Sequence, residues 1–336
     1  GKTRVITTKI VSLINKHFIA PQQICAVTFT NKAAAEMRDR VKQELGSERS
    51  SLITISTFHS LGLNILKEES VALGLGRNFT LFDQYDSFKL IKDIVREKFP
   101  QILVDNSEKT VVEEIATDIS TWKTSLLRPE DIAVRTIRVQ VYEAYQAYLS
   151  ACNAADFEDL IFKTTLLLRD NQAVRDKWSS YYKYILVDEY QDTNETQYQL
   201  LKYLTSKNKR FTVVGDDDQS IYAWRGARPE NIKVLSNDFP DLKVIKLEQN
   251  YRSTQHILNC ANKLISNNEH IFNKTLYTKS NVGKKVQIME LRTQNDEADR
   301  VVQLILAHQF RTHSQWKEYA VLYRSNSQSR PLEKAF

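Results

Sequence analysis

Two adjacent carboxylates stand directly after an apolar segment near the middle of the chain. Asp188 and Glu189 follow residues 184–187, which read Tyr-Ile-Leu-Val. Such a run is typical of a buried strand, and a parallel sheet meets its ligands at the carboxyl ends of its strands. Carboxylates placed there can hold Mg²⁺ and can take a proton from an attacking water. The pair is therefore a candidate centre for metal-assisted hydrolysis, although a solvated turn would also accommodate it.

The first residues of the chain indicate what would be hydrolysed. Gly1, Lys2 and Thr3 match the end of a phosphate-binding loop of the form G-x-x-x-x-G-K-[ST]. The lysine of such a loop contacts phosphates and the hydroxyl contacts Mg²⁺. The glycine-rich first half has no counterpart before Gly1, so we expect part of the loop to be missing. A Gly-Lys-Thr triplet also occurs by chance, and only its combination with the carboxylate pair favours nucleotide hydrolysis.

Three further segments place polar or aromatic residues just after a predicted strand. Thr30 or Asn31 can cap a helix whose amino end suits a phosphate, or can be a plain cap. Phe58 would lie at the sheet edge, where it could stack on a base, although a single phenylalanine is more often a core residue. His59 has no partner at metal-ligand spacing, which favours a structural role. Gln219 is placed to sense a γ-phosphate or a bound water.

Two later segments combine aromatic residues with arginine. Tyr222, Trp224 and Arg225 interleave rings with a cation, which suits stacking on unpaired bases and contact with a phosphate backbone. A buried aromatic cluster would show the same pattern. At a predicted domain junction, Tyr251 could stack on adenine and Arg252 could reach a γ-phosphate as an arginine finger. Arg252 could equally be a surface residue paired with a carboxylate.

Strand–helix alternation predicts an α/β fold with a parallel sheet. Between residues 59 and 170 the pattern reads as helix after helix with no convincing strand, which predicts a helical insertion into the sheet domain. We expect helices at 5–16, 31–45, 85–99, 129–151, 156–168, 253–265 and 297–310. We expect strands at 24–29, 52–56, 184–188, 211–215, 244–247, 286–291 and 319–323.

Bulk properties narrow the classes of protein. The 336 residues carry 47 Lys and Arg against 41 Asp and Glu, a net charge of +6 that permits a polyanionic partner. The three cysteines lie far apart, with neither zinc spacing nor a disulfide framework, so we expect a reducing, cytoplasmic setting. No apolar run is long enough to span a bilayer, so we expect no membrane partner.

Taken in order, these segments resemble the motifs of the superfamily 1 DNA helicases of the UvrD/PcrA/Rep group, most nearly its Rep-type members. The resemblance runs through the whole chain and rests on residues 1–3, 26–32, 57–59, 187–194, 213–227, 247–254 and 320–330. Several ordered blocks are far more specific than any one of them. The resemblance implies a RecA-like P-loop domain 1A at 1–58 and 171–251, a helical insertion 1B at 59–170, and part of a second RecA-like domain 2A at 252–336.

The resemblance also implies roles for single residues. Glu189 would be the base for the attacking water, Gln219 the γ-phosphate sensor and Arg252 the finger. ATP would be contacted by Gly1, Lys2, Thr3 and Tyr251, and Mg²⁺ by Thr3 and Asp188. Single-stranded DNA would be contacted by Thr30, Asn31, Phe58, His59, Tyr222, Trp224 and Arg225.

The implied activity is ATP-driven 3′→5′ translocation on single-stranded DNA, with unwinding of duplex DNA in replication or repair. The implied partners are single-stranded DNA, DNA junctions and replication or repair proteins. Two other interpretations stay open, namely the motor part of a helicase–nuclease and a non-catalytic DNA-binding module. Because the start of the phosphate loop and the last family motifs are not among these 336 residues, we expect this chain alone to be a poor ATPase.

Overall fold

The computed structural model describes residues 1–336 except residues 77 and 104–106 and the side chain of Arg225. The chain forms two compact units. The first comprises Gly1–Arg252 and Asn262–Lys279, and the second comprises Ser253–Ala261 and Ser280–Phe336. Among the described residues, no helix has the length and apolar character needed to cross a membrane.

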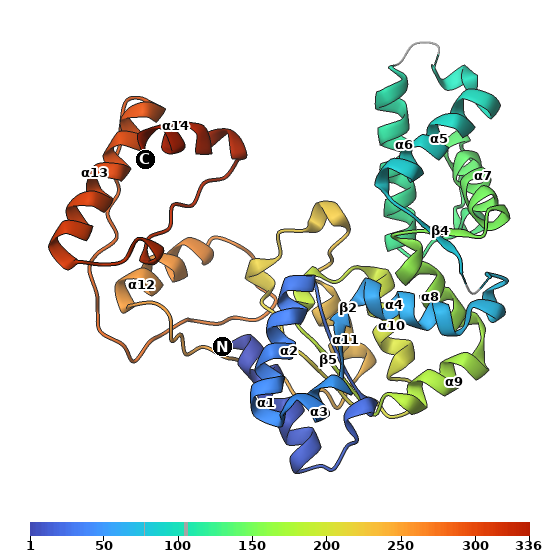
Figure 1. The fold of residues 1–336 in the computed structure, drawn as a ribbon, viewed down its shortest axis with the longest axis horizontal. Coiled ribbons are helices and arrows are strands. Elements are labelled where there is room, and N and C mark those ends of the chain that lie inside the picture. Colours follow the sequence, from blue (N-terminus) through green and yellow to red (C-terminus); the bar gives the residue numbers. More distant parts are fainter. Residues whose placement is uncertain (77, 104–106) are drawn as a thin grey trace. The chain divides into compact units, whose positions relative to one another are not determined.

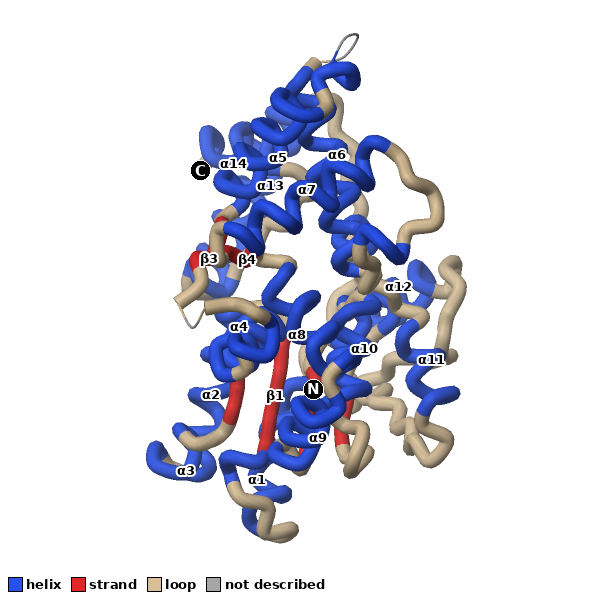
Figure 2. Tube along the Cα trace, turned by 90° about the vertical axis from the view of Figure 1, so that its right-hand side faces the viewer, coloured by secondary structure: helices blue, strands red, loops and turns tan. Residues whose placement is uncertain are grey.

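A four-stranded parallel sheet organises the first unit (Figure 1, Figure 2). Its strands are β1 (Ile24–Thr28), β2 (Thr54–Thr57), β5 (Tyr184–Val187) and β6 (Phe211–Val213), in the order β2-β1-β5-β6. Strand β1 is buried along its whole length and pairs with both β2 and β5. Because all four strands run in the same direction, the segments that follow them meet at one edge of the sheet. The predicted parallel α/β sheet is confirmed.

Helices cover both faces of this sheet, because successive residues of a strand point to opposite faces. Ala26 of β1 lies in one core cluster with residues of α1 and α2. Its neighbour Val27 lies in the other cluster with residues of α4, α8, α9, α10 and α11. The helices are α1 (Lys2–Asn15), α2 (Asn31–Leu45), α3 (Ser47–Ser51), α4 (Phe58–Glu68), α8 (Asp159–Asp170), α9 (Gln172–Tyr181), α10 (Glu195–Leu204) and α11 (Asn231–Asp238).

Part of the predicted helical insertion has a core of its own. The helices α5 (Gln84–Lys98), α6 (Glu108–Thr124) and α7 (Ile137–Ala151) bury apolar side chains against one another. Helices α4 and α8, at the two ends of the predicted insertion, instead contribute side chains to the core beside the sheet. The separately packed body is therefore shorter than the insertion that the sequence predicts.

The prediction of no strand in this region is wrong. Strands β3 (Thr80–Phe82) and β4 (Ala154–Asp156) pair in parallel as a second sheet. Each has three residues, which is too short to show a period in the sequence, and the pairing joins segments far apart in the chain.

A buried lysine joins the insertion to the sheet domain. The Lys123 ammonium on α6 donates to Asp156 and lies 2.8 Å from Asp159 Oδ1, with all three side chains buried. Burial alone would lower the pKa of Lys123, but the two carboxylates outweigh it and raise that pKa. The Thr196 hydroxyl of α10 donates to the Lys123 carbonyl over 2.7 Å. These contacts fix α6 against α8 and α10.

The second unit contains helices and no strand among its described residues. Helices α13 (Gln294–Thr312) and α14 (Ser329–Ala335) pack together, and α12 (Gln255–Ile265) contributes residues to both units. The strands predicted at 286–291 and 319–323 are wrong, because neither segment has a paired neighbour and Ile288 and Leu322 are almost fully exposed. In the first unit, the strand predicted at 244–247 is also wrong.

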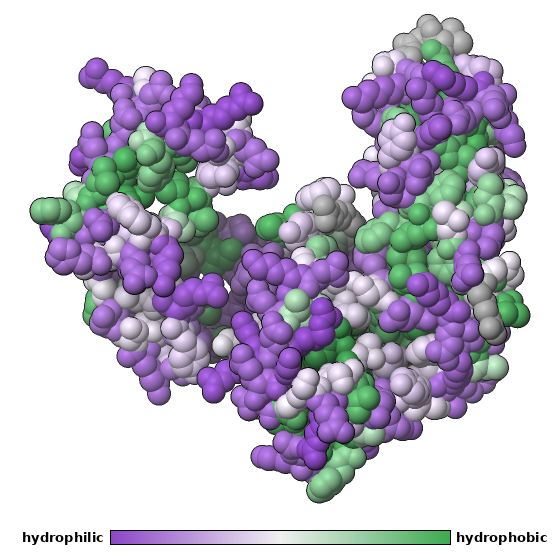
Figure 3. Space-filling model, viewed as in Figure 1, coloured by the Kyte–Doolittle hydropathy of each residue, from purple (hydrophilic) through white to green (hydrophobic). Residues whose placement is uncertain are grey.

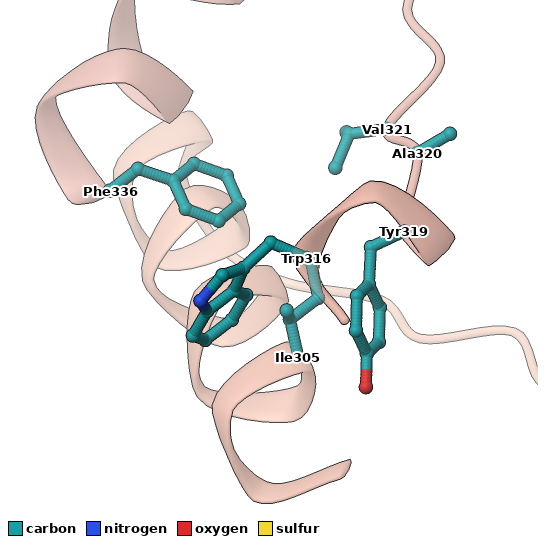
Figure 4. A pocket seen from close by; sticks show the side chains of 6 residues that line it. All are labelled: Ile305, Trp316, Tyr319, Ala320, Val321 and Phe336. Carbon is teal, nitrogen blue, oxygen red and sulfur yellow. The ribbon is translucent and has the colours of Figure 1, made fainter. Parts of the chain in front are cut away.

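An apolar hollow of about 300 Å³ lies in the second unit. It is lined by Trp316 and Phe336, by Ile305 of α13, and by Ala320 and Val321, as Figure 4 shows. In the space-filling view of Figure 3, apolar surface gathers on this unit. Large apolar side chains here are therefore in contact with solvent, unlike those beside the sheet of the first unit.

Candidate active site

Backbone hydrogen bonds join the segment after β5 to β1 and to the segment after β6, at the carboxyl edge of the sheet. The Asp188 N–H donates to the Val27 carbonyl over 2.9 Å, and the Tyr190 N–H donates to the Val214 carbonyl over 3.0 Å. The sheet ladder thus continues past the end of β5 into the turn that carries the carboxylate pair. This places Asp188 and Glu189 on rigid backbone.

Lys2 and Glu189 form an ion pair across 187 positions of sequence. Lys2 Nζ donates to Glu189 Oε2 over 3.0 Å, and the side chains are 24% and 38% exposed. Gly1 caps α1, and Lys2 and Thr3 begin it, so the free N–H groups of the helix start favour an anion there. The fold thus brings together the two sequence features that predict nucleotide hydrolysis.

Glu189 adopts a backbone conformation that few residues with a side chain adopt. Its φ is 50° and its ψ is 45°, in the left-handed region. Such a conformation costs roughly 1–3 kcal/mol and clusters at functional sites. It is held by hydrogen bonds, because the Glu189 N–H donates to Asp188 Oδ1 and the Gln191 amide donates to Glu189 Oε2, each over 3.0 Å. The carboxylate is therefore fixed in direction and remains open to solvent.

Burial and the charge of Glu189 make the ionised forms of the neighbouring carboxylates unfavourable. Asp188 is buried, and its burial together with the charge of Glu189 raises its pKa. Burial, again with Glu189, also raises the pKa of Asp192, whose Oδ1 is buried without a hydrogen-bond partner among the described residues. A bound cation would relieve both, and carboxylate and hydroxyl oxygens are the ligands that Mg²⁺ prefers. Asp188 and Thr3 are residues of these two types, so their chemistry fits the expected metal.

Gln191 links this turn to the segment after β6. Its Nε2 donates to Glu189 and its Oε1 accepts from the Asp216 N–H over 2.9 Å. A Cβ on Gly215 would lie 3.0 Å from Gln191 Oε1, so a glycine there lets the two segments close on each other. The sequence interpretation gave Gln191 no role, although Gln191 lies within residues 187–194, one of the blocks that carry the family resemblance.

Gln219 is held in the segment that follows β6. Its Nε2 donates to Asp216 Oδ2 over 2.5 Å, and it ends a single helical turn, Asp217–Gln219. A continuous set of polar contacts therefore runs from Lys2 through Glu189, Gln191 and Asp216 to Gln219. The predicted catalytic base and the predicted γ-phosphate sensor belong to one hydrogen-bonded network.

Three aromatic rings form a row beside this network. The rings of Phe29 and Tyr222 are stacked with their centroids 5.0 Å apart, and those of Tyr222 and Trp224 are 6.3 Å apart. Trp224 is 73% exposed, so the row ends in a side chain that is largely in contact with solvent. Phe29 was missed, because its place directly after β1 was interpreted only through the helix cap at Thr30. The predicted role of the Arg225 side chain lies outside the described residues.

The other predicted DNA contacts are placed differently. Phe58 is 5% exposed and packs in the core beside the sheet, as expected of a single phenylalanine, and its contact with a base stays a prediction. It begins α4, whose first turn directs the ring inward. His59 stacks on Phe157 with centroids 3.9 Å apart, and burial lowers its pKa to about 4, so it is neutral at pH 7. Thr30 caps α2 by accepting from the Ala33 N–H over 3.1 Å.

Tyr251 and Arg252 lie on an exposed turn. Tyr251 is 76% exposed, and the Arg252 N–H donates to the Asn250 side chain over 2.8 Å. Within the described part of the chain, neither residue shares a hydrogen bond or ion pair with Lys2 or Glu189. The structure therefore leaves their roles toward ATP as predictions.

A parallel sheet with a lysine at the start of α1 and a carboxylate pair after β5 is the arrangement of P-loop domains. The model of the UvrD/REP helicase N-terminal domain matches residues 1–240, and that of the UvrD-like helicase C-terminal domain matches residues 245–336. The chain belongs to the UvrD/REP helicase family, as its motifs predicted.

Similar proteins include ATP-dependent DNA helicase Rep of Escherichia coli, 48% identical over 340 residues that cover 99% of this chain and 50% of that protein. ATP-dependent DNA helicase PcrA of Staphylococcus epidermidis is 42% identical over 342 residues, which cover 100% of this chain and 46% of that protein. The expected Rep-type resemblance is confirmed. The chain spans about half the length of these relatives.

Proposed function

We propose that the protein containing this chain is an ATP-dependent DNA helicase that translocates 3′→5′ on single-stranded DNA. It would unwind duplex DNA or DNA junctions in replication or repair. The observation that carries the proposal is the polar network from Lys2 to Gln219, which ends three residues before the aromatic row at Tyr222. The names of the similar proteins, which are ATP-dependent DNA helicases, support the helicase activity. We also propose a cytoplasmic location, since the substrate is DNA and the cysteines are free.

In this proposal each residue of the site has a separate role in ATP hydrolysis. Lys2 would exchange Glu189 for the β- and γ-phosphates, and Glu189, released from Lys2, would accept a proton from the attacking water. Thr3 and Asp188 would hold Mg²⁺, which when bound neutralises charge on the phosphates. Gln219 would sense the γ-phosphate. Tyr251 would stack on adenine and Arg252 would stabilise charge that develops in the transition state.

The same segment that carries Gln219 also carries the DNA-stacking rings. Tyr222 and Trp224 follow Gln219 by three and five residues, and Phe29 supports Tyr222 from the end of β1. A shift of Gln219 on loss of the γ-phosphate would therefore move the aromatic row. Such a connection is what a motor that moves along unpaired bases requires.

The test is a DNA-stimulated ATPase assay with strand separation on duplexes that carry either a 3′ or a 5′ single-stranded tail. We expect the full-length protein to hydrolyse ATP faster with single-stranded DNA and to unwind only the 3′-tailed duplex. The 336-residue chain, assayed alongside, should bind DNA in a salt-sensitive manner, hydrolyse ATP poorly and unwind nothing. Full-length protein that binds DNA but shows no ATPase would overturn the proposal in favour of a DNA-binding module.

A further inference from the structure

Lys274 reaches the acidic turn that carries Gln219 from a segment more than fifty residues further along the chain. Its ammonium donates to Asp216 and to Asp217 Oδ1 (2.5 Å), and lies 3.0 Å from Asp218 Oδ2. Three consecutive carboxylates would repel one another without a nearby cation. The Lys274 side chain is only 19% exposed, so this contact is shielded from competing water.

Asp216 is shared between Lys274 and Gln219. Its Oδ1 accepts from the Lys274 ammonium, and its Oδ2 accepts from the Gln219 amide over 2.5 Å. Its backbone N–H donates to Gln191, which in turn donates to Glu189. The orientation of the Asp216 carboxylate therefore decides where the Gln219 amide points.

The segment that carries Lys274 is itself anchored. The Ile271 N–H donates to Asp217 Oδ2 over 2.9 Å, and His270 Nδ1 lies 2.8 Å from Asp218 Oδ1. On the other side of Lys274, the Asn262 side chain accepts from the Leu276 N–H over 3.1 Å and donates to its carbonyl over 2.8 Å. The backbone on both sides of Lys274 is thus held by hydrogen bonds, which keeps the Lys274 side chain against the acidic turn.

The lowered pKa of Asp217 agrees with this arrangement of charges. Burial alone would raise the pKa of Asp217, but the hydrogen bond from Lys274 and the N–H groups of Ile271 and Phe272 hold it below its ordinary value. Asp217, Asp218 and His270 also have the spacing of a cation site. The Lys274 ammonium already lies against these carboxylates and supplies their positive charge, so the cluster acts as an ion pair within the protein.

We propose that Lys274 is a positioning residue for Gln219, acting through the carboxylate of Asp216. The inference rests on the proposed function of Gln219 as γ-phosphate sensor. It assigns the segment around Lys274, which follows α12 in sequence but belongs to the first unit, to the ATPase machinery. Lys274 does not touch the nucleotide in this account, and its effect is on the orientation of the Gln219 amide.

The experiment compares Lys274→Met and Lys274→Arg in the full-length protein with the matched control Lys279→Met. Lys279 is exposed and shares no ion pair within the described residues. We expect Lys274→Met to lower the kcat of the DNA-stimulated ATPase about tenfold or more and to change the KM for ATP much less, because only the transition-state geometry is affected. Lys274→Arg should restore part of the rate, and Lys279→Met should match the wild type.

A double-mutant cycle with Gln219→Ala separates positioning from a merely structural role. In the Gln219→Ala background, Lys274→Met should cause no further loss of kcat. Independent, multiplying losses, or a normal kcat for Lys274→Met, would overturn the positioning role. If Lys274→Met melts below the assay temperature, Asp216→Asn replaces it, with the same expected loss and the same cycle deciding. Wild-type protein without ATPase would overturn the proposed function and this inference together, whereas active wild type with a slow Gln219→Ala variant and a normal Lys274→Met variant would overturn this inference alone.

Discussion

Replacing Glu189 by glutamine tests the proposed site most directly. The amide keeps the size of the side chain, and its oxygen can still accept a hydrogen bond from Lys2 or from Gln191, each now 3.0 Å away. The amide cannot take a proton from water at neutral pH. The substitution therefore removes the proposed chemistry and preserves the shape of the site.

Two magnitudes follow from the structure. Loss of a general base lowers a rate by about 10²–10⁴-fold, or about 3–5 kcal/mol of activation free energy. The Lys2–Glu189 pair is partly exposed, at 24% and 38%, so its loss should cost only about 0–1 kcal/mol of unfolding free energy. The neutral amide no longer forms an ion pair with Lys2, so the Lys2 ammonium exchanges more readily to the phosphates. We therefore expect ATP to bind as well as before or more tightly.

The assay measures kcat of the DNA-stimulated ATPase, equilibrium binding of ATP and of single-stranded DNA, and the melting temperature, all on the full-length protein. Glu230→Gln is the matched control, since Glu230 is exposed and, among the described residues, its hydrogen bonds are to the backbone of Lys233 and Val234. A Glu189→Gln protein that turns over ATP within a few-fold of wild type would refute the assignment of Glu189 as the base. A large loss of ATP binding would show instead that Glu189 organises the pocket.

Three further predictions concern other residues with proposed roles. Asp188→Asn should abolish ATPase but raise the melting temperature of the nucleotide-free protein at pH 7. Burial and Glu189 raise the pKa of Asp188 in the fold, so ionisation disfavours folding as pH rises, and the gain should vanish below the ordinary pKa of about 4. Arg252→Ala should lower kcat strongly and ATP affinity less, and a loss confined to affinity would rule out a finger. Trp224→Ala should weaken single-stranded DNA binding by about 1–3 kcal/mol relative to Tyr85→Ala on α5, while unchanged affinity with a lower melting temperature would indicate a packing role.

The sequence by itself determined the parallel sheet of the first unit, with strands β1, β2, β5 and β6 near their predicted positions. Helix α2 has the predicted bounds of residues 31–45, because its cap at Thr30 and its apolar spacing are local signals. The carboxylates at 188 and 189 could be placed at the end of a strand for the same reason. Family membership also followed from sequence, since ordered motifs do not depend on coordinates.

Only the tertiary structure decided which way side chains face and which distant segments meet. The same position after a strand buries Phe58 but puts Phe29 in the aromatic row, because the turn that follows each strand differs. The strands predicted at 286–291 and 319–323 did not form, since an apolar segment becomes a strand only when a neighbour pairs with it. Gln191 and Lys274 gained roles only through partners far along the chain. Hydrogen bonds of this kind form only when the chain packs and brings distant segments together. Residue type and local spacing therefore do not predict them.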